Sequence, residues 1–355
     1  VMDLNDGKLE VDGDYRIQKY DSKKESYVEC NGALRIEGAD EEVTVGGDFY
    51  TQSAWQDYPA VTSSCNYFSA GKMILKGNFT QLKGNATNFV ANGIKVVFAG
   101  TGVQEISFET PASSYFSYPV FENKQISVKS GISNWHLNES ITIPDEGYPL
   151  QIVGDMDMNG YTLTVNRGVV MKSGRYSVNG GSCKITGDLI QESGVMDLND
   201  GKLEVDGDYR IQKYDTKKES YVECDGALRI EGEKEEVTVG GDFYTQSANE
   251  DDYWTNSLYE RNYFSAGKMI LKGNFTQLTG NATNFQANGI KVVFAGTRLQ
   301  EVYFETPTTS YISNPVYQNT KVCYVGKRRL TMSGSNKVLT VSLPGNDKAV
   351  SEGLL

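Results

Sequence analysis

The chain has 355 residues, a formal net charge of -12, and abundant glycine (37) and tyrosine (22). This negative charge repels phosphate backbones, and no basic stripe with interleaved aromatic residues interrupts it, so we expect no nucleic-acid partner. No run of eighteen apolar residues occurs, so we expect no membrane insertion. Val, Ile, Thr and Phe are frequent and no segment has a sustained helical period, which predicts an all-β fold.

The first predicted element is a strand within the string LEVDGDY, and its pattern recurs along the chain. The pattern is apolar-x-apolar-x-Gly-(Asp/Asn)-apolar. It occurs at 9–15, 43–49, 73–79, 183–189, 203–209, 237–243 and 269–275. The period-2 alternation predicts a short strand with one buried face. The Gly-Asp or Gly-Asn step predicts a turn, because glycine tolerates positive φ and Asx side chains bond to the nearby backbone.

The spacing of these strands favours a parallel β-solenoid (β-helix) of stacked short strands. Within the repeats they follow one another every 20 to 35 residues without helical patterns, whereas sandwich strands recur about every 8–12 residues. Stacked turns would align apolar residues inward and place Asn, Asp and Thr ladders at the corners. The expected core comprises Leu9, Val11, Leu34, Ile36, Val43, Val45, Met73, Leu75, Ile94, Val96 and their second-copy equivalents. Segments 19–31 and 53–69, with their counterparts, should project as loops.

A tandem duplication sets the expected domain organisation. Residues 1–54 recur as 195–248 with four substitutions, and 66–101 recur as 262–297 with two. We expect a first solenoid copy at 1–194 and a second, truncated copy at 195–340 that continues the same solenoid. A C-terminal tail or cap would follow at 341–355.

The residue types that support catalysis or metal binding do not form a recognisable pattern. His136 is the only histidine and no Gly-x-Ser-x-Gly elbow occurs, so Trp135 and His136 are predicted to be turn residues. The five cysteines lack CxxC spacing, and Cys183 is expected to be a small buried hydrophobe. The repeated aspartates match neither an EF-hand nor the Gly-rich calcium repeat. We therefore expect no catalytic residue, no metal and no cofactor.

One segment differs between the copies and carries the candidate ligand-binding residues. It reads AWQDYPAVTSSC in the first copy and ANEDDYWTNSLYER in the second. Loop aromatics supply rigid apolar area with a polar tip, which suits sugar rings or protein partners. The candidates are Trp55, Tyr58, Tyr253, Trp254 and Tyr259. The alternative is that these side chains pack onto the solenoid wall.

Several longer strings extend this interpretation through a family resemblance. GKLEVDGDYRIQ, EEVTVGGDFYTQ, GKMILKGNFTQ, GIKVVFAGTGVQEISFETPASSYF and MDMNGYTLTVNRG resemble repeats of very large surface or secreted proteins of clostridial-type bacteria. The resemblance covers nearly the whole chain. It implies a β-solenoid similar to filamentous-haemagglutinin and adhesin repeats, and it provides no catalytic residue.

The sequence thus leads to a functional expectation with alternatives. We expect a non-catalytic structural segment of a bacterial protein that is extracellular or on the cell surface, acting as a stalk or an adhesin. Its partners would be neighbouring repeats of the same protein, and glycans or proteins on a target surface. One alternative is a filament subunit that associates end to end through unpaired strand edges. Another is a β-helix enzyme acting on polysaccharides, which the duplication disfavours because an active site would have to occur twice.

Overall fold

The computed structural model describes residues 1–54, 68–84, 88–123, 125–129, 131–145, 148–248, 263–280 and 284–325. Every regular element in these ranges is a β-strand, and they contain no helix long and apolar enough to cross a membrane. Two compact units are distinguished, Val1–Asp157 and Met158–Leu355. The boundary between the two sequence copies, after residue 194, falls inside strand β24 (Ser193–Asp197).

Unit 1 contains strands β1 to β18. They are β1 (Met2–Asp3), β2 (Lys8–Val11), β3 (Tyr15–Ile17), β4 (Lys19–Asp21), β5 (Ser26–Val28), β6 (Leu34–Arg35), β7 (Glu42–Val45), β8 (Phe49–Thr51), β9 (Lys72–Leu75), β10 (Phe79–Gln81), β11 (Val90–Phe98), β12 (Gln104–Phe108), β13 (Tyr115–Phe121), β14 (Ile126–Val128), β15 (Trp135–His136), β16 (Ile141–Ile143), β17 (Leu150–Val153) and β18 (Met156–Asp157). Two of its sheets have five strands each, in the orders β14-β12-β10-β8-β3 and β13-β11-β9-β7-β2.

Unit 2 contains strands β19 to β38. They are β19 (Thr162–Val165), β20 (Val169–Ser173), β21 (Arg175–Ser177), β22 (Ser182–Ile185), β23 (Leu189–Gln191), β24, β25 (Lys202–Val205), β26 (Tyr209–Ile211), β27 (Lys213–Asp215), β28 (Ser220–Val222), β29 (Asp225–Ile230), β30 (Glu236–Val239), β31 (Phe243–Thr245), β32 (Tyr263–Phe264), β33 (Lys268–Leu271), β34 (Phe275–Gln277), β35 (Gln286–Phe294), β36 (Gln300–Phe304), β37 (Tyr311–Tyr317) and β38 (Val322–Val325). Its sheets include the strand series β20-β23-β26-β31-β34-β36-β38 and β19-β22-β25-β30-β33-β35.

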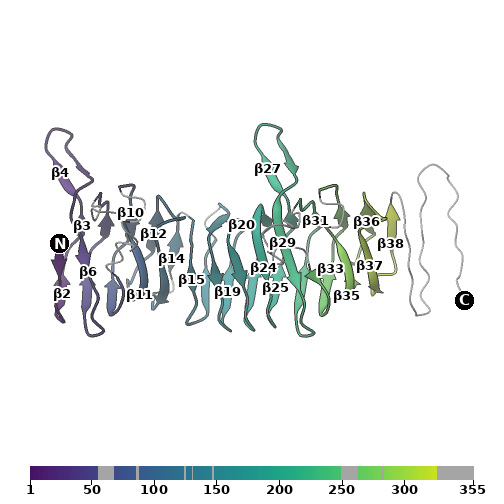
Figure 1. The fold of residues 1–355 in the computed structure, drawn as a ribbon, viewed down its shortest axis with the longest axis horizontal. Coiled ribbons are helices and arrows are strands. Elements are labelled where there is room, and N and C mark those ends of the chain that lie inside the picture. The colour runs from purple at the N-terminus through teal and green to yellow at the C-terminus, as the bar shows by residue number, and fades with distance from the viewer. Residues whose placement is uncertain are drawn as a thin grey trace, which may run out of the picture. The chain divides into compact units, whose positions relative to one another are not determined.

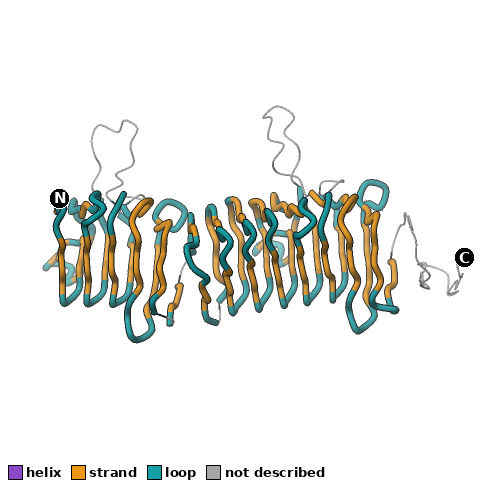
Figure 2. Tube along the Cα trace, turned by 90° about the horizontal axis from the view of Figure 1, so that it is seen from below, coloured by secondary structure: helices purple, strands orange, loops and turns teal. Residues whose placement is uncertain are grey.

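Apart from the β4–β5 and β27–β28 hairpins, strands pair in parallel with strands that lie at least two places away in the strand order, as β2 does with β7 and β22 with β25 (Figure 1). Each such pair joins two successive sets of consecutive strands. We call one such set of consecutive strands a layer. The register is regular: Leu163 pairs with Cys183 and Cys183 pairs with Leu203, a spacing of 20 residues each time. Within each unit, strands of successive layers therefore lie side by side (Figure 2). The sequence prediction of an all-β chain with parallel strands is confirmed.

The alternating apolar residues form a core within each unit, as predicted, with two exceptions. Val43, Val45, Met73 and most of the other predicted residues are fully buried, as are all their second-copy equivalents. Leu9 and Val11 are only partly buried. The reason is that β2 is the last strand of its sheet and pairs with β7 alone.

The Gly-Asp and Gly-Asn steps form the predicted bends, but the expected reason for glycine is wrong. None of these glycines has a φ in the left-handed region. A Cβ on Gly77 would lie 2.3 Å from the carbonyl oxygen of Gly47, and a Cβ on Gly241 would lie 2.7 Å from the carbonyl carbon of Gly207. Glycine is required because backbones of adjacent layers approach closely at this corner.

The Asx residue after each corner glycine forms a ladder between layers. In unit 1 the Asp14 carboxylate accepts a bond from the amide of Asp48 at 2.9 Å, and the Asp48 carboxylate accepts one from Asn78 at 2.7 Å. Asp188, Asp208, Asp242 and Asn274 form the same series in unit 2. This confirms the predicted corner ladders and satisfies backbone groups that a bend would otherwise leave unpaired.

Cys183 and Trp135 are both buried. Cys183 is buried as predicted, and burial raises the pKa of its thiol to about 12. Trp135 and His136 are strand residues, so their prediction as turn residues is wrong. Trp135 is buried because its ring packs against Phe116 and Phe121, with centroid distances of 5.7 and 5.8 Å.

A buried carboxylate joins the first two layers of unit 1. The Glu41 carboxylate accepts bonds from the amides of Asp6 at 3.1 Å and Glu37 at 2.7 Å. Burial tends to raise the pKa of Glu41, but the bonds from these amides and from Gly38 outweigh it and hold the pKa below its ordinary value of 4.5. Ionised Glu41 is thus favoured in the folded chain.

We expect this carboxylate to make unit 1 sensitive to acid. Because its folded-state pKa is lowered, its stabilisation is complete above pH 4.5 and is lost as the pH falls through the folded pKa. Glu41→Gln should lower local stability at pH 7 by about 1–3 kcal/mol and flatten its pH dependence below pH 5. Urea unfolding between pH 3 and 7 measures this, with Glu10→Gln on an exposed position as the control. Identical pH profiles for Glu41→Gln and the wild type would contradict it.

Candidate functional site

Two antiparallel hairpins stand out from the otherwise parallel layers (Figure 1). β4 and β5 form the first in unit 1, and β27 and β28 form the second in unit 2. They belong to the segments that the sequence predicts as projecting loops. The prediction that these segments project is confirmed, and the structure adds that they are ordered hairpins.

Each hairpin is specified by its turn. In the first, the Asp21 carboxylate accepts a bond from the Lys23 amide at 2.9 Å, and Glu25 adopts a left-handed φ of 51°. In the second, Asp215 accepts from Lys217 at 2.8 Å, and the bonds from Lys217 and Lys218 lower the pKa of Asp215. An aspartate that closes a turn in this way fixes the strand register.

The second hairpin is an insertion into a shorter layer. Tyr209 pairs with Leu189, and Asp225 pairs with Ser193. Tyr209 and Asp225 are 16 positions apart in the chain, whereas their partners Leu189 and Ser193 are four positions apart. The sheets continue on both sides of the insertion, so the layer closes without requiring a hairpin.

Two tyrosines face each other across each hairpin. Tyr20 and Tyr27 have ring centroids 5.4 Å apart at an interplanar angle of 69°, and they are 55% and 49% exposed. In the second hairpin the rings of Tyr214 and Tyr221 lie 5.3 Å apart at 71°, and Tyr214 is 43% exposed. We call each set the tyrosine pair. Both pairs present nearly perpendicular aromatic rings at the surface.

An arginine in the strand that leads into each hairpin contacts one ring of the tyrosine pair. In unit 2 the Arg210 guanidinium carbon lies 4.6 Å from the ring centroid of Tyr221 and 3.7 Å from that of Tyr244. Arg210 also forms an ion pair with Asp208 at 2.7 Å. Arg16, Tyr27, Tyr50 and Asp14 form the equivalent arrangement in unit 1. These cation–π contacts fix the hairpin against the layer.

Arg16 and Tyr50 each contact a carboxylate at the base of the first hairpin. The Asp48 amide, and then the Arg16 guanidinium, hold the pKa of Asp14 below its ordinary value. Burial raises the pKa of Tyr50, and its hydrogen bond to Asp48 at 2.9 Å raises it further. Tyr50 therefore stays neutral and Asp14 ionised at neutral pH, and the Asp14 carboxylate is paired with Arg16.

We expect the arginine to control how rigidly the hairpin is held. Arg210→Leu removes both cation–π contacts and the ion pair, so hairpin amides at 213–222 should exchange faster, with local stability reduced by about 1–2 kcal/mol. Hydrogen exchange measured by mass spectrometry tests this. Arg229→Leu is the control, because its ion pair with Glu231 lies outside the hairpin. Unchanged protection in Arg210→Leu would show that the contacts do not restrain the hairpin.

The ligand-binding residues predicted from the sequence, Trp55, Tyr58, Tyr253, Trp254 and Tyr259, lie outside the described residues. The tyrosine pairs were not singled out from the sequence. The signal was present as Lys-Tyr-Asp and Ser-Tyr-Val on either side of a short polar turn, which is typical of a hairpin with cross-strand aromatics.

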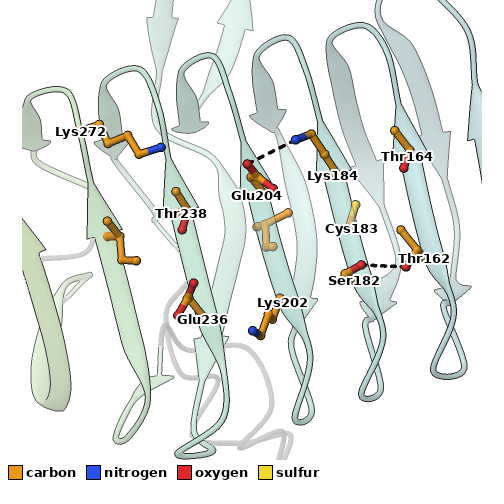
Figure 3. A pocket seen from close by; sticks show the side chains of 12 residues that line it. Thr162, Thr164, Ser182, Cys183, Lys184, Lys202, Glu204, Glu236, Thr238 and Lys272 are labelled. Carbon is orange, nitrogen blue, oxygen red and sulfur yellow. Dashed lines mark hydrogen bonds and ion pairs between the residues drawn. The ribbon is translucent and has the colours of Figure 1, made fainter. Parts of the chain in front are cut away.

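The outer face of one sheet in unit 2 forms an open depression of about 480 Å³ (Figure 3). Thr162 and Ser182 approach within 2.9 Å there, and Lys184 pairs with Glu204 at 3.4 Å. Neighbouring strands thus satisfy these polar side chains mutually, as expected for a solvated sheet face.

Groups that could support other chemistry are few in the described part of the chain. His136 Nδ1 lies 3.1 Å from the carboxylate of Asp157, and the Tyr118 ring contacts the imidazole edge-on. Within the described ranges, no group of three or more His, Cys, Asp or Glu residues is arranged to hold a metal ion. The tyrosine pairs are therefore the most developed candidate binding feature.

Comparison of the chain with protein-family models, curated proteins and solved structures found no match.

Proposed function

We propose that the chain is a non-catalytic β-solenoid segment of a large bacterial surface or secreted protein, acting as a stalk or an adhesin. The observation that carries this proposal is the parallel pairing of equivalent residues in successive layers, such as Leu163, Cys183 and Leu203. A layer that contacts mainly its neighbours can be duplicated without redesigning the rest. The nearly identical copies at 1–54 and 195–248 are consistent with growth by such duplication.

The stalk proposal is tested by lengthening the protein. We insert one further copy of residues 1–194 after residue 194 and measure both proteins by small-angle X-ray scattering. The maximum dimension should increase by about 4.8 Å for each added layer, while the cross-sectional radius stays constant. A particle that thickens, or one that does not lengthen, would overturn the solenoid proposal.

A further inference from the structure

We propose that each tyrosine pair binds the uncharged sugar rings of a polysaccharide. The inference deepens the adhesin role and rests on that proposed function. The hairpins are ordered and exposed, although a layer can close without one, as the direct connection from β23 to β24 shows. A feature that the fold does not require, yet holds in a defined geometry, is suited to binding.

The geometry of the rings fits a sugar. A pyranose ring has a face of C–H groups and a rim of hydroxyls, so it combines apolar and polar contacts in the same way as tyrosine. Tyr20 and Tyr27 form a corner of 69°, in which one ring can stack on a sugar face while phenolic hydroxyls reach its rim. Arg16 fixes Tyr27 in advance, which reduces the ordering cost of binding.

The charge of the hairpin favours an uncharged ligand. Residues 19–29 contain three lysines and three acidic residues, and so do residues 213–223, which gives each segment a formal charge of zero. The arginine at the base is not available to an anion, because Arg16 is already paired with Asp14 at 2.8 Å and lies over two tyrosine rings. An acidic polysaccharide or a phosphate group would find no net positive charge in either segment.

The size of the surface favours a sugar over a folded protein. Stable protein interfaces bury about 1,200–2,000 Å² in total, with a well-packed apolar centre. The large apolar side chains exposed on the hairpins are tyrosines alone: Tyr20, Tyr27 and Tyr214. The two rings of a pair offer an area that suits one or two sugar units rather than a protein interface.

The experiment is affinity electrophoresis of the full chain in gels containing a neutral polysaccharide. The probes are hydroxyethyl cellulose, galactomannan, laminarin and dextran, with alginate as an anionic polysaccharide. The hairpin variant carries Tyr20→Ser and Tyr214→Ser. The control variant carries Tyr148→Ser and Tyr161→Ser, which remove exposed tyrosines outside the hairpins, 82% and 38% exposed. A third variant, Tyr20→Phe with Tyr214→Phe, keeps the rings. Circular dichroism establishes that all variants are folded.

At least one neutral polysaccharide should retard the wild type, and the hairpin variant should lose at least tenfold in affinity. The control and the phenylalanine variant should stay within about threefold of wild type. The proposal would be overturned if no neutral probe retarded the wild type, if the hairpin variant were retarded equally, or if alginate alone caused retardation. So would self-association that the hairpin variant abolishes, since the occupant would then be a second copy. The scattering experiment can succeed when this one fails, so the two proposals are separable.

Discussion

Leu203→Ala is expected to destabilise unit 2 by about 2–5 kcal/mol, whereas Leu9→Ala should cost clearly less. The two leucines occupy equivalent positions in the strand KLEV of the two copies, β25 and β2. Leu203 is 1% exposed because β25 pairs with both β22 and β30, so truncation leaves a cavity. Leu9 is partly exposed already, so less apolar area is lost and solvent can fill the space.

Native-state hydrogen exchange is the appropriate measurement, because it reports the stability of each segment separately and does not assume two-state unfolding. Amides of β25 and β26 are followed in one variant and those of β2 and β3 in the other. Equal losses of stability at the two positions would show that the local sequence, rather than coverage by a neighbouring layer, determines how much the leucine stabilises its strand.

Gly207→Ala should destabilise unit 2 by about 1–3 kcal/mol, while Gly13→Ala should be neutral or slightly stabilising. These glycines are also equivalent between the copies, and neither has a left-handed φ, so backbone strain does not distinguish them. A Cβ on Gly207 would lie 2.3 Å from the Asp188 carboxylate oxygen and 2.7 Å from the Gly187 carbonyl carbon. A Cβ on Gly13 would meet nothing within 4 Å.

The predicted damage at Gly207 extends to the corner ladder. The methyl group would displace the Asp188 carboxylate, which accepts a bond from the Asp208 amide at 2.8 Å. Thermal unfolding and exchange of the Asp208 amide should both report the change. If Gly13→Ala proved as damaging as Gly207→Ala, the close approach of layers would not be the reason for glycine at this corner.

The sequence by itself determined the features that depend on local periodicity. Alternation in strings such as KLEV and KMIL identified the inward residues, and the Gly-Asp steps located the bends and the Asx ladder of Asp14, Asp48 and Asn78. The projecting segment that contains β4 and β5 was also predicted. These features follow from side-chain direction and turn chemistry within a few residues, which every copy of the pattern shares.

The tertiary structure decided what depends on residues that are distant in the chain. Leu9 and Leu203 have the same local sequence but different burial, because only β25 has a strand on both sides. Glycine is required at the corners because the backbone of the adjacent layer lies close, and not because the residue has a positive φ. The rigid tyrosine pair depends on Arg210 lying between Tyr221 and Tyr244, two residues 23 positions apart. Such neighbours are set by the stacking of layers of unequal length, which local periodicity does not encode.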